Sequence, residues 1–170
     1  MSAYSEHWLE WYSGALALAH QLLKGANTHG HDPADIVQTA YLKAQQQKRL
    51  PDDVYAQKAW LLKVVRNACI DVLRVGKKFD PTAADEMAEC SEMNAGKQQL
   101  IAQERTLQVR RAMASLPLEM REILALRDIN DLPYSDIAAV LGIEKGTVMS
   151  RLYRARMALK EKLSHWYADQ

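Results

Sequence analysis

The sequence has few of the features that mark membrane, secreted or disulfide-stabilised proteins. It has no run of 18 apolar residues, so a membrane-spanning helix is not expected. Its first residues, MSAYSEHWLEW, lack the basic start and apolar stretch of a signal peptide. Its two cysteines, Cys69 and Cys90, have neither disulfide density nor the spacing of metal ligands. These absences predict a protein of the reducing cytoplasm.

Strand signals and catalytic motifs are also missing. Alternating β-branched runs bounded by turns do not occur, whereas apolar residues recur at i, i+3 and i+4. The expected fold class is therefore all-α. No glycine-rich phosphate loop is present, and His20, His29 and His31 have no acidic or cysteine partners at ligand spacing. An enzyme is the least favoured class, and we expect no cofactor, no metal and no small-molecule substrate.

Charge is distributed unevenly, although the net charge is only +1. Residues Asp80 to Gly96 contain five acids, no base and few large apolar residues, a composition typical of a linker. It separates two halves that each carry a basic face. We therefore expect an N-terminal domain over 1–78, a flexible acidic linker over 79–99 and a C-terminal domain over 100–170.

A basic helix near the C-terminus is the strongest single feature. Over Gly146 to Leu163, one apolar stripe is formed by Val148, Leu152, Ala155, Leu159 and Leu163. Between Lys145 and Lys162 there are six basic residues and one acid. A short amphipathic helix, Pro133 to Leu141, precedes it, with Pro133 in the first turn and with Ile137, Ala138 and Leu141 facing inward. Gly142 is placed to end that helix as a left-handed cap. Helix, tight turn and basic helix together predict a helix-turn-helix, whose second helix enters the DNA major groove.

Two helices of the first half present distinctive outer faces. Asp32 and Pro33 predict the start of one, as N-cap and first-turn residue. Its outer face has little charge and includes an exposed leucine, which suits either a plain surface or a partner-binding face. A further helix, Val54 to Val75, buries its apolar side and leaves a stripe with no acid, which favours contact with phosphates. The stripe consists of Lys63, Arg66, Asn67, Ile70 and Arg74.

The second half is expected to begin with two more helices. The first, from about Gln98 to Ser115, offers six residues to a core: Leu100, Ile101, Leu107, Val109, Ala112 and Met113. Leu116-Pro117 breaks it. The next helix, Leu118 to Asp128, is expected to bury Met120, Ile123, Leu124 and Leu126.

Three stretches resemble one protein family. Residues Leu116 to Leu163 resemble the promoter-binding C-terminal domain of extracytoplasmic-function (ECF) sigma factors of bacterial RNA polymerase. DPADIVQTAYLKA, Asp32 to Ala44, is similar to the helix with which that family binds the polymerase clamp. WLLKVVRNACIDVLR, Trp60 to Arg74, is similar to its helix for the −10 promoter element. The three occur in the family order and cover nearly the whole chain.

The resemblance implies partners and site residues. It implies binding to core RNA polymerase and promoter DNA, and an anti-sigma factor, often a membrane protein, that would hold the chain at the inner membrane. Polymerase binding would involve Asp32, Asp35, Gln38, Thr39, Leu42 and Lys43. The −10 element would be bound by the stripe of Lys63, Arg66, Asn67, Ile70 and Arg74, with Tyr55 as a stacking side chain. The −35 element would be bound by Lys145, Thr147, Ser150, Arg151 and Arg154.

Two functional classes thus compete. A sigma factor would bind DNA weakly alone and would direct transcription with core polymerase in response to envelope or environmental stress. A helix-turn-helix regulator would bind duplex DNA without polymerase and would give no role to Asp35 or Gln38.

Overall fold

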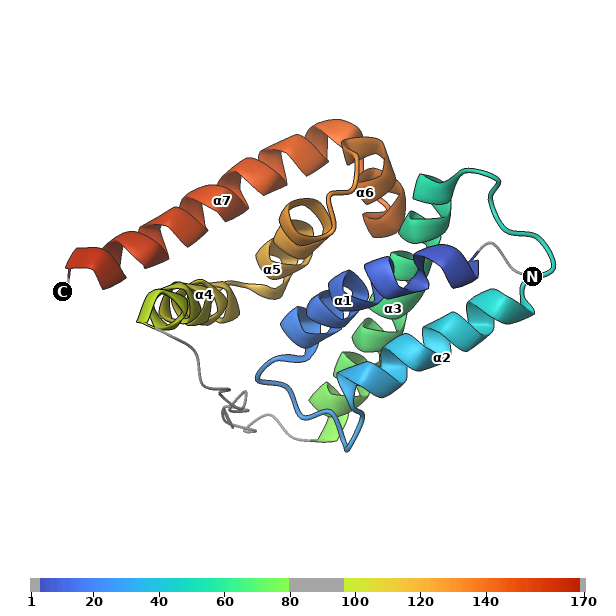
Figure 1. Cartoon of the computed structure of the whole chain (residues 1–170), viewed down its shortest axis with the longest axis horizontal. Coiled ribbons are helices and arrows are strands. Elements are labelled where there is room, and N and C mark those ends of the chain that lie inside the picture. The colour runs from blue at the N-terminus through green and yellow to red at the C-terminus, as the bar shows by residue number, and fades with distance from the viewer. Residues whose placement is uncertain (1–3, 80–96, 169–170) are drawn as a thin grey trace.

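The N-terminal half is a cluster of three helices. The computed structural model describes residues 4–79 and 97–168, and every regular element among them is helical, as expected. Helix α1 (Tyr4–Leu23) packs against both α2 (Pro33–Gln46) and α3 (Val54–Phe79), and α2 also packs against α3 (Figure 1). The centre of the cluster is apolar and holds Ala15, Leu18, Leu22, Val37, Leu61 and Val65.

The start of α2 is set by local chemistry that the sequence shows. Asp32 is extended, and its Oδ1 accepts a hydrogen bond from the Ala34 N–H at 3.0 Å. Pro33 occupies the first turn, where its missing N–H leaves no helical bond unmade. Such a cap stabilises a helix by about 1 kcal/mol. The predicted start is confirmed, and α2 buries Ile36, Val37, Ala40 and Ala44.

The C-terminal half contains four α-helices and one π-helical turn: α4 (Lys97–Ala114), α5 (Leu118–Leu124), η1 (Ala125–Ile129), α6 (Tyr134–Leu141) and α7 (Lys145–Ala168). Helix α5 packs on α7, and α6 packs on α7 across the turn at Gly142 (Figure 1). Gly142 is left-handed with φ 66°, which confirms its predicted role as a helix cap. The expected Leu118–Asp128 helix is correct in place, but its second half is π-helical, and Met120 is only half-buried.

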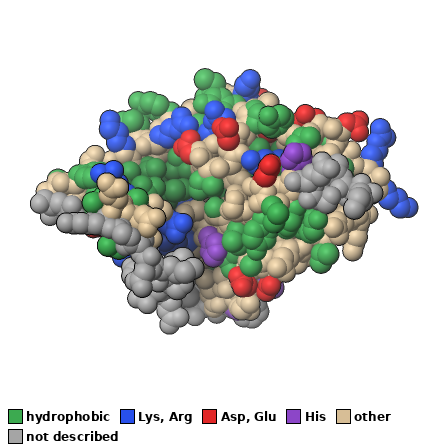
Figure 2. All heavy atoms as spheres, in the orientation of Figure 1, with side chains coloured by type: hydrophobic (Ala, Val, Ile, Leu, Met, Phe, Trp, Pro, Cys, Tyr) green, Lys and Arg blue, Asp and Glu red, His purple; other side chains and the backbone are tan. Residues whose placement is uncertain are grey.

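The prediction for the helix that begins the second half was wrong about its core. Leu100, Ile101, Leu107 and Val109 are exposed, Ala112 is half-buried, and only Met113 of the six is buried. The reason is that, among the described elements, α4 packs substantially only against α7. Figure 2 shows hydrophobic side chains at the surface in the region between α7 and α4. An apolar spacing alone did not reveal that α4 lacks covering neighbours.

Two details of the helix-turn-helix also differ from expectation. Pro133 has ψ 151°, so it lies before α6 as the cap residue rather than inside its first turn. The inward face of α6 is centred on Ile137 and Val140, whereas Ala138 and Leu141 are half-buried. Ala138 and Leu141 still pack against the core, so the inward face is the predicted one rotated slightly towards Val140.

The two halves are in contact. Helix α3 packs against α6, and α1 packs against α5 and η1. Buried residues from both halves join one hydrophobic cluster. The acidic segment Asp80 to Gly96, predicted to be a linker, lies outside the described residues, as does Cys90. None of the described helices combines the length and apolar character needed to cross a membrane.

Candidate nucleic-acid and polymerase interfaces

The outer face of α2 is exposed along its length. Asp35, Gln38, Thr39 and Lys43 are all exposed, and Leu42 keeps 56% of its surface open to solvent. Asp32 is different because its carboxylate already serves as the N-cap. The face therefore offers one carboxylate, two neutral polar side chains, one apolar side chain and one cation, a mixture suited to a protein partner rather than to a phosphate backbone.

The stripe on α3 contains two kinds of residue. Lys63, Asn67 and Arg74 are exposed, and Arg74 lies 3.7 Å from Asp71 in a solvent-screened pair. Arg66 and Ile70 are half-buried. The Arg66 Nε donates to Glu122 Oε2 at 2.8 Å, so this guanidinium faces the C-terminal half. The structure thus leaves three members of the stripe free to meet a ligand and holds one in an ion pair.

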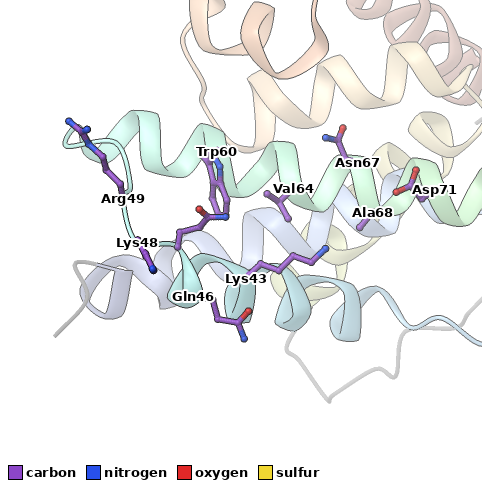
Figure 3. Close-up of a pocket in the computed structure, with 10 residues that line it drawn as sticks. Lys43, Gln46, Lys48, Arg49, Trp60, Val64, Asn67, Ala68 and Asp71 are labelled. Atoms are coloured by element: carbon purple, nitrogen blue, oxygen red, sulfur yellow. The ribbon is translucent and has the colours of Figure 1, made fainter.

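A cleft of about 790 Å³ lies between the end of α2, the following turn and α3 (Figure 3). Lys43, Lys48 and Arg49 bring three cations to it, and the half-buried Trp60 supplies an aromatic ring. The other lining residues are Gln46, Gln47, Val64, Asn67, Ala68 and Asp71. Cations beside an aromatic ring suit a single-stranded nucleic acid, whose phosphates need charge and whose bases stack.

Sequence reasoning missed Trp60 as a candidate site residue. Its signal was the spacing along α3, where Trp60, Val64, Asn67 and Asp71 recur at i, i+4, i+7 and i+11 on one side. Tyr55, the stacking residue that the sequence proposed, is 65% exposed and is not among the residues that line this cleft. Trp60 and Tyr55 therefore offer aromatic rings at different places.

The turn between α6 and α7 presents the N-terminal end of the basic helix. Val148, Leu152 and Ala155 are buried, which fixes the rotation of α7 about its axis. On the remaining surface Lys145, Ser150 and Arg154 are exposed, and Thr147 and Arg151 are half-buried beside a hollow against α6. Figure 2 shows Lys and Arg side chains along the upper edge of the molecule, where Figure 1 places α7.

Two side chains of this region have partners that limit their roles. The Ser150 hydroxyl donates to the Thr147 carbonyl at 3.1 Å, which leaves its oxygen able to accept. Arg156 is paired with Asp128 at 2.5 Å, and this hydrogen bond raises the pKa of its guanidinium. Arg156 thus braces α7 against η1. Arg154, two residues earlier, has no ion pair among the described residues.

Comparison with known proteins agrees with this arrangement. Residues 11–79 match the family model for Sigma-70 region 2, and residues 106–159 match that for Sigma-70 region 4. The ECF RNA polymerase sigma factor SigM of Mycobacterium tuberculosis is 30% identical over 146 residues, which are 86% of this chain and 71% of that protein. The ECF RNA polymerase sigma-E factor of Escherichia coli is 28% identical over 144 residues, 78% of this chain and 74% of its own length.

Two solved structures share the fold. The sigma factor RpoE from Bartonella quintana, solved in complex with the anti-sigma factor NepR, has a TM-score of 0.70 at 23% identity and covers 96% of this chain and 98% of its own. CnrH, solved with the cytosolic domain of CnrY, has a TM-score of 0.58 at 21% identity, covering 95% and 85%. The region 2 and region 4 matches and the similarity to SigM together show that the chain belongs to the ECF family of RNA polymerase sigma factors.

Proposed function

We propose that this sigma factor uses three surfaces, one for core polymerase and two for promoter DNA. The polymerase surface, the exposed face of α2, distinguishes a sigma factor from a regulator that binds DNA alone. That face, from Asp35 to Lys43, would bind core RNA polymerase. The exposed part of the α3 stripe and the cleft beside Trp60 would bind the opened −10 element. The start of α7, from Lys145 to Arg154, would read the −35 element in the major groove.

The exposed face of α2 is the observation that carries the proposal. A regulator that binds only duplex DNA would use the α6–α7 pair. It would have no partner for the exposed mixed polar and apolar face of α2. The ECF relatives and the region 2 match over 11–79 support the sigma factor over this alternative. The proposed action is binding and positioning, without a cofactor or a small-molecule substrate.

Transcription in vitro tests this proposal directly. The full chain, with and without core polymerase, would be incubated with a genomic fragment library, and transcripts would be mapped by sequencing. We expect a defined set of start sites only when both components are present. Specific retention of duplex fragments by the chain alone, with no transcripts from the combination, would favour the regulator instead.

The partner that controls the activity belongs to the same proposal. Both structural neighbours were solved as complexes, one of them with a protein described as an anti-sigma factor. We infer that this chain acts in the cytoplasm and is held inactive by an anti-sigma factor until an envelope or environmental stress releases it. Co-purification of the tagged chain from unstressed and stressed cells tests this, and the partner should be lost on induction.

A further inference from the structure

One member of the α3 stripe is occupied by the protein itself. The Glu122 side chain on α5 is 6% exposed, and Arg66 on α3 is 24% exposed. Their second contact, from Arg66 Nη2 to Glu122 Oε1, is 3.4 Å. A carboxylate that meets a guanidinium side-on presents two oxygens much as a phosphate does. Glu122 therefore occupies the one guanidinium of the stripe that is not exposed and that could otherwise meet a DNA phosphate.

A second junction is built around Asn130, which follows the π-helical turn. Asn130 is 2% exposed, and its Nδ2 donates to the Gly14 carbonyl on α1 at 3.1 Å and to the Ala125 carbonyl at 2.9 Å. Its own carbonyl accepts from Lys58 Nζ on α3 at 2.6 Å. One residue of the C-terminal half thus binds two helices of the N-terminal half. The π turn, closed by the Asn130 N–H on the Ala125 carbonyl, sets this position.

The Asn130 junction also depends on the absence of a side chain at Gly14. A Cβ at that position would lie 2.1 Å from Asn130 Oδ1 and 3.1 Å from its Cγ. The Asn130 amide is tied by two hydrogen bonds and is buried, so it has little freedom to move aside. Glycine in the middle of a helix is otherwise unfavourable relative to alanine. The close approach of the two halves explains its presence.

A third contact joins α5 to the C-terminal end of α1. Arg121 on α5 donates to the Gln21 carbonyl at 2.7 Å and lies 3.4 Å from the Lys24 carbonyl. A cation at these last carbonyls suits the negative end of the helix dipole. All three junctions are polar, and every group in them can bond to water once the halves separate. Opening the joint also separates apolar residues that both halves contribute to one buried cluster, so the binding of polymerase or DNA must offset that cost.

We propose that Glu122 and Asn130 form an internal clasp that closes the C-terminal half over α3 and withholds Arg66 from promoter DNA in the free protein. The clasp regulates the −10 interface, so the inference rests on the proposed function of α3. Polymerase or DNA binding opens the clasp, and Arg66 then exchanges a carboxylate for a phosphate. The closed form would keep the free protein from occupying DNA unproductively.

The first test measures opening without reference to function. Gly14→Ala introduces the clashing Cβ but favours the helix itself, so the variant should fold, as circular dichroism would verify. Ser13→Ala changes the neighbouring exposed position of α1 and serves as the matched control. Small-angle X-ray scattering of the full chain should show a larger radius of gyration for Gly14→Ala than for wild type and Ser13→Ala. Equal radii for all three proteins would overturn the clasp.

The second test measures masking. Anisotropy of a labelled 20-nucleotide single-stranded DNA of mixed sequence would be titrated with each protein at one salt concentration. If about 90% of the wild-type molecules are closed, opening raises the apparent affinity about tenfold. Glu122→Gln removes the negative charge that competes with DNA for Arg66, so this variant should also bind the DNA more tightly. Arg66→Ala in the Gly14→Ala background should remove most of the gain, and an open variant with wild-type affinity would refute masking.

Failure of the clasp and failure of the proposed function give different results. Scattering involves neither polymerase nor DNA, whereas transcription with core polymerase does not require a closed free state. A chain that directs transcription but has the same radius with and without Gly14→Ala is a sigma factor without a clasp. A chain that opens on Gly14→Ala but directs no transcription with core polymerase keeps the clasp and loses the proposed function.

Discussion

Cys69 lies on the core side of α3 and is completely buried. Burial raises the pKa of its thiol to about 12, because the thiolate would lose its hydration among apolar neighbours. At pH 8 only about one such thiol in ten thousand would be ionised. A buried thiol with so little thiolate is a packing residue and not a redox sensor.

This predicts a chemically silent thiol. In a Cys90→Ser variant, the remaining Cys69 should not react with a disulfide reagent such as Ellman's reagent at pH 8 while the protein is folded. It should react stoichiometrically after denaturation, which is the internal control. Reaction of the native variant at the rate of a free thiol would show that α3 opens readily or that Cys69 is accessible.

Arg154 and Lys160 make a matched pair on α7, since both are exposed cations of one helix. Arg154 lies in the N-terminal half of α7, which we propose enters the groove, and Lys160 lies beyond that half. If Arg154 binds a guanine edge with two hydrogen bonds, Arg154→Ala should cost about 1–3 kcal/mol and relax preference at one −35 position. Lys160→Ala should weaken binding evenly and lower the salt slope by about one or less.

The measurement uses polymerase loaded with each variant and a library of −35 variants of an identified promoter, at two salt concentrations. An equal loss on all sequences for Arg154→Ala would assign it to a phosphate. Base reading would then belong to Lys145, Thr147, Ser150 or Arg151.

At the scale of the element, the sequence predicted those features that depend on neighbouring residues in the chain, above all the helix ends. The Asp32 cap, Pro33 and Gly142 act within a few residues of themselves, so helix ends near them were placed correctly. The stripe of α7 was correct over Val148, Leu152 and Ala155, which are buried where α7 packs against α5 and α6, whereas Leu159 and Leu163 are only half-buried. The core of α4 was wrong because its burial depends on whether other helices cover it. The π turn at Ala125–Ile129 was not foreseen because no local residue signal requires it.

Helix α2 gives the prediction that belongs to this scale. Asp35→Arg reverses an exposed charge in the first turn, which should cost about 0.5–1 kcal/mol of stability through the helix dipole. Its effect on a protein interface should be larger, so binding to core polymerase should weaken measurably in a pull-down titration. Glu104→Arg makes the same charge reversal on the exposed surface of α4 and should leave binding unchanged. Equal core affinity for the Asp35 variant and wild type would remove this residue from the polymerase surface.

At the scale of the whole molecule, the contact between halves could not be read from the sequence. Its partners are separated by 56 residues for Arg66 and Glu122 and by 116 for Gly14 and Asn130. Arg66, Glu122 and Gly14 lie within their own helices and Asn130 follows the π turn, and none of them is marked locally as a partner of the other half. Arg66 was predicted only as part of a basic stripe that contacts DNA, without its ion pair to Glu122. Polar pairing across such distances leaves no periodic pattern. Trp60 was missed for a related reason, since a cleft is formed only when α2 and α3 come together.

One like-charge pair across the halves tests their closed arrangement through pH. Asp136 on α6 has a pKa raised above its ordinary 3.8, first by burial and then by the negative charge of Asp53, before α3. A raised pKa means that the native state favours the neutral acid. Its contribution to stability is therefore full below pH 3.8 and is lost as the pH rises through the native value.

Replacing Asp53 separates the two causes. Asp53→Asn keeps the N-cap on the Ala56 N–H, now 2.8 Å from the carboxylate, because asparagine caps helices about as well as aspartate. It removes the charge, so the pKa of Asp136 should fall but stay above its ordinary value, since burial remains. Carboxyl-carbon NMR titration of Asp136 measures this, with Asp52→Asn at the adjacent exposed position as control. Asp53 and Asp136 belong to different halves. If the pKa of Asp136 is the same in Asp53→Asn and wild type, the halves are apart in solution.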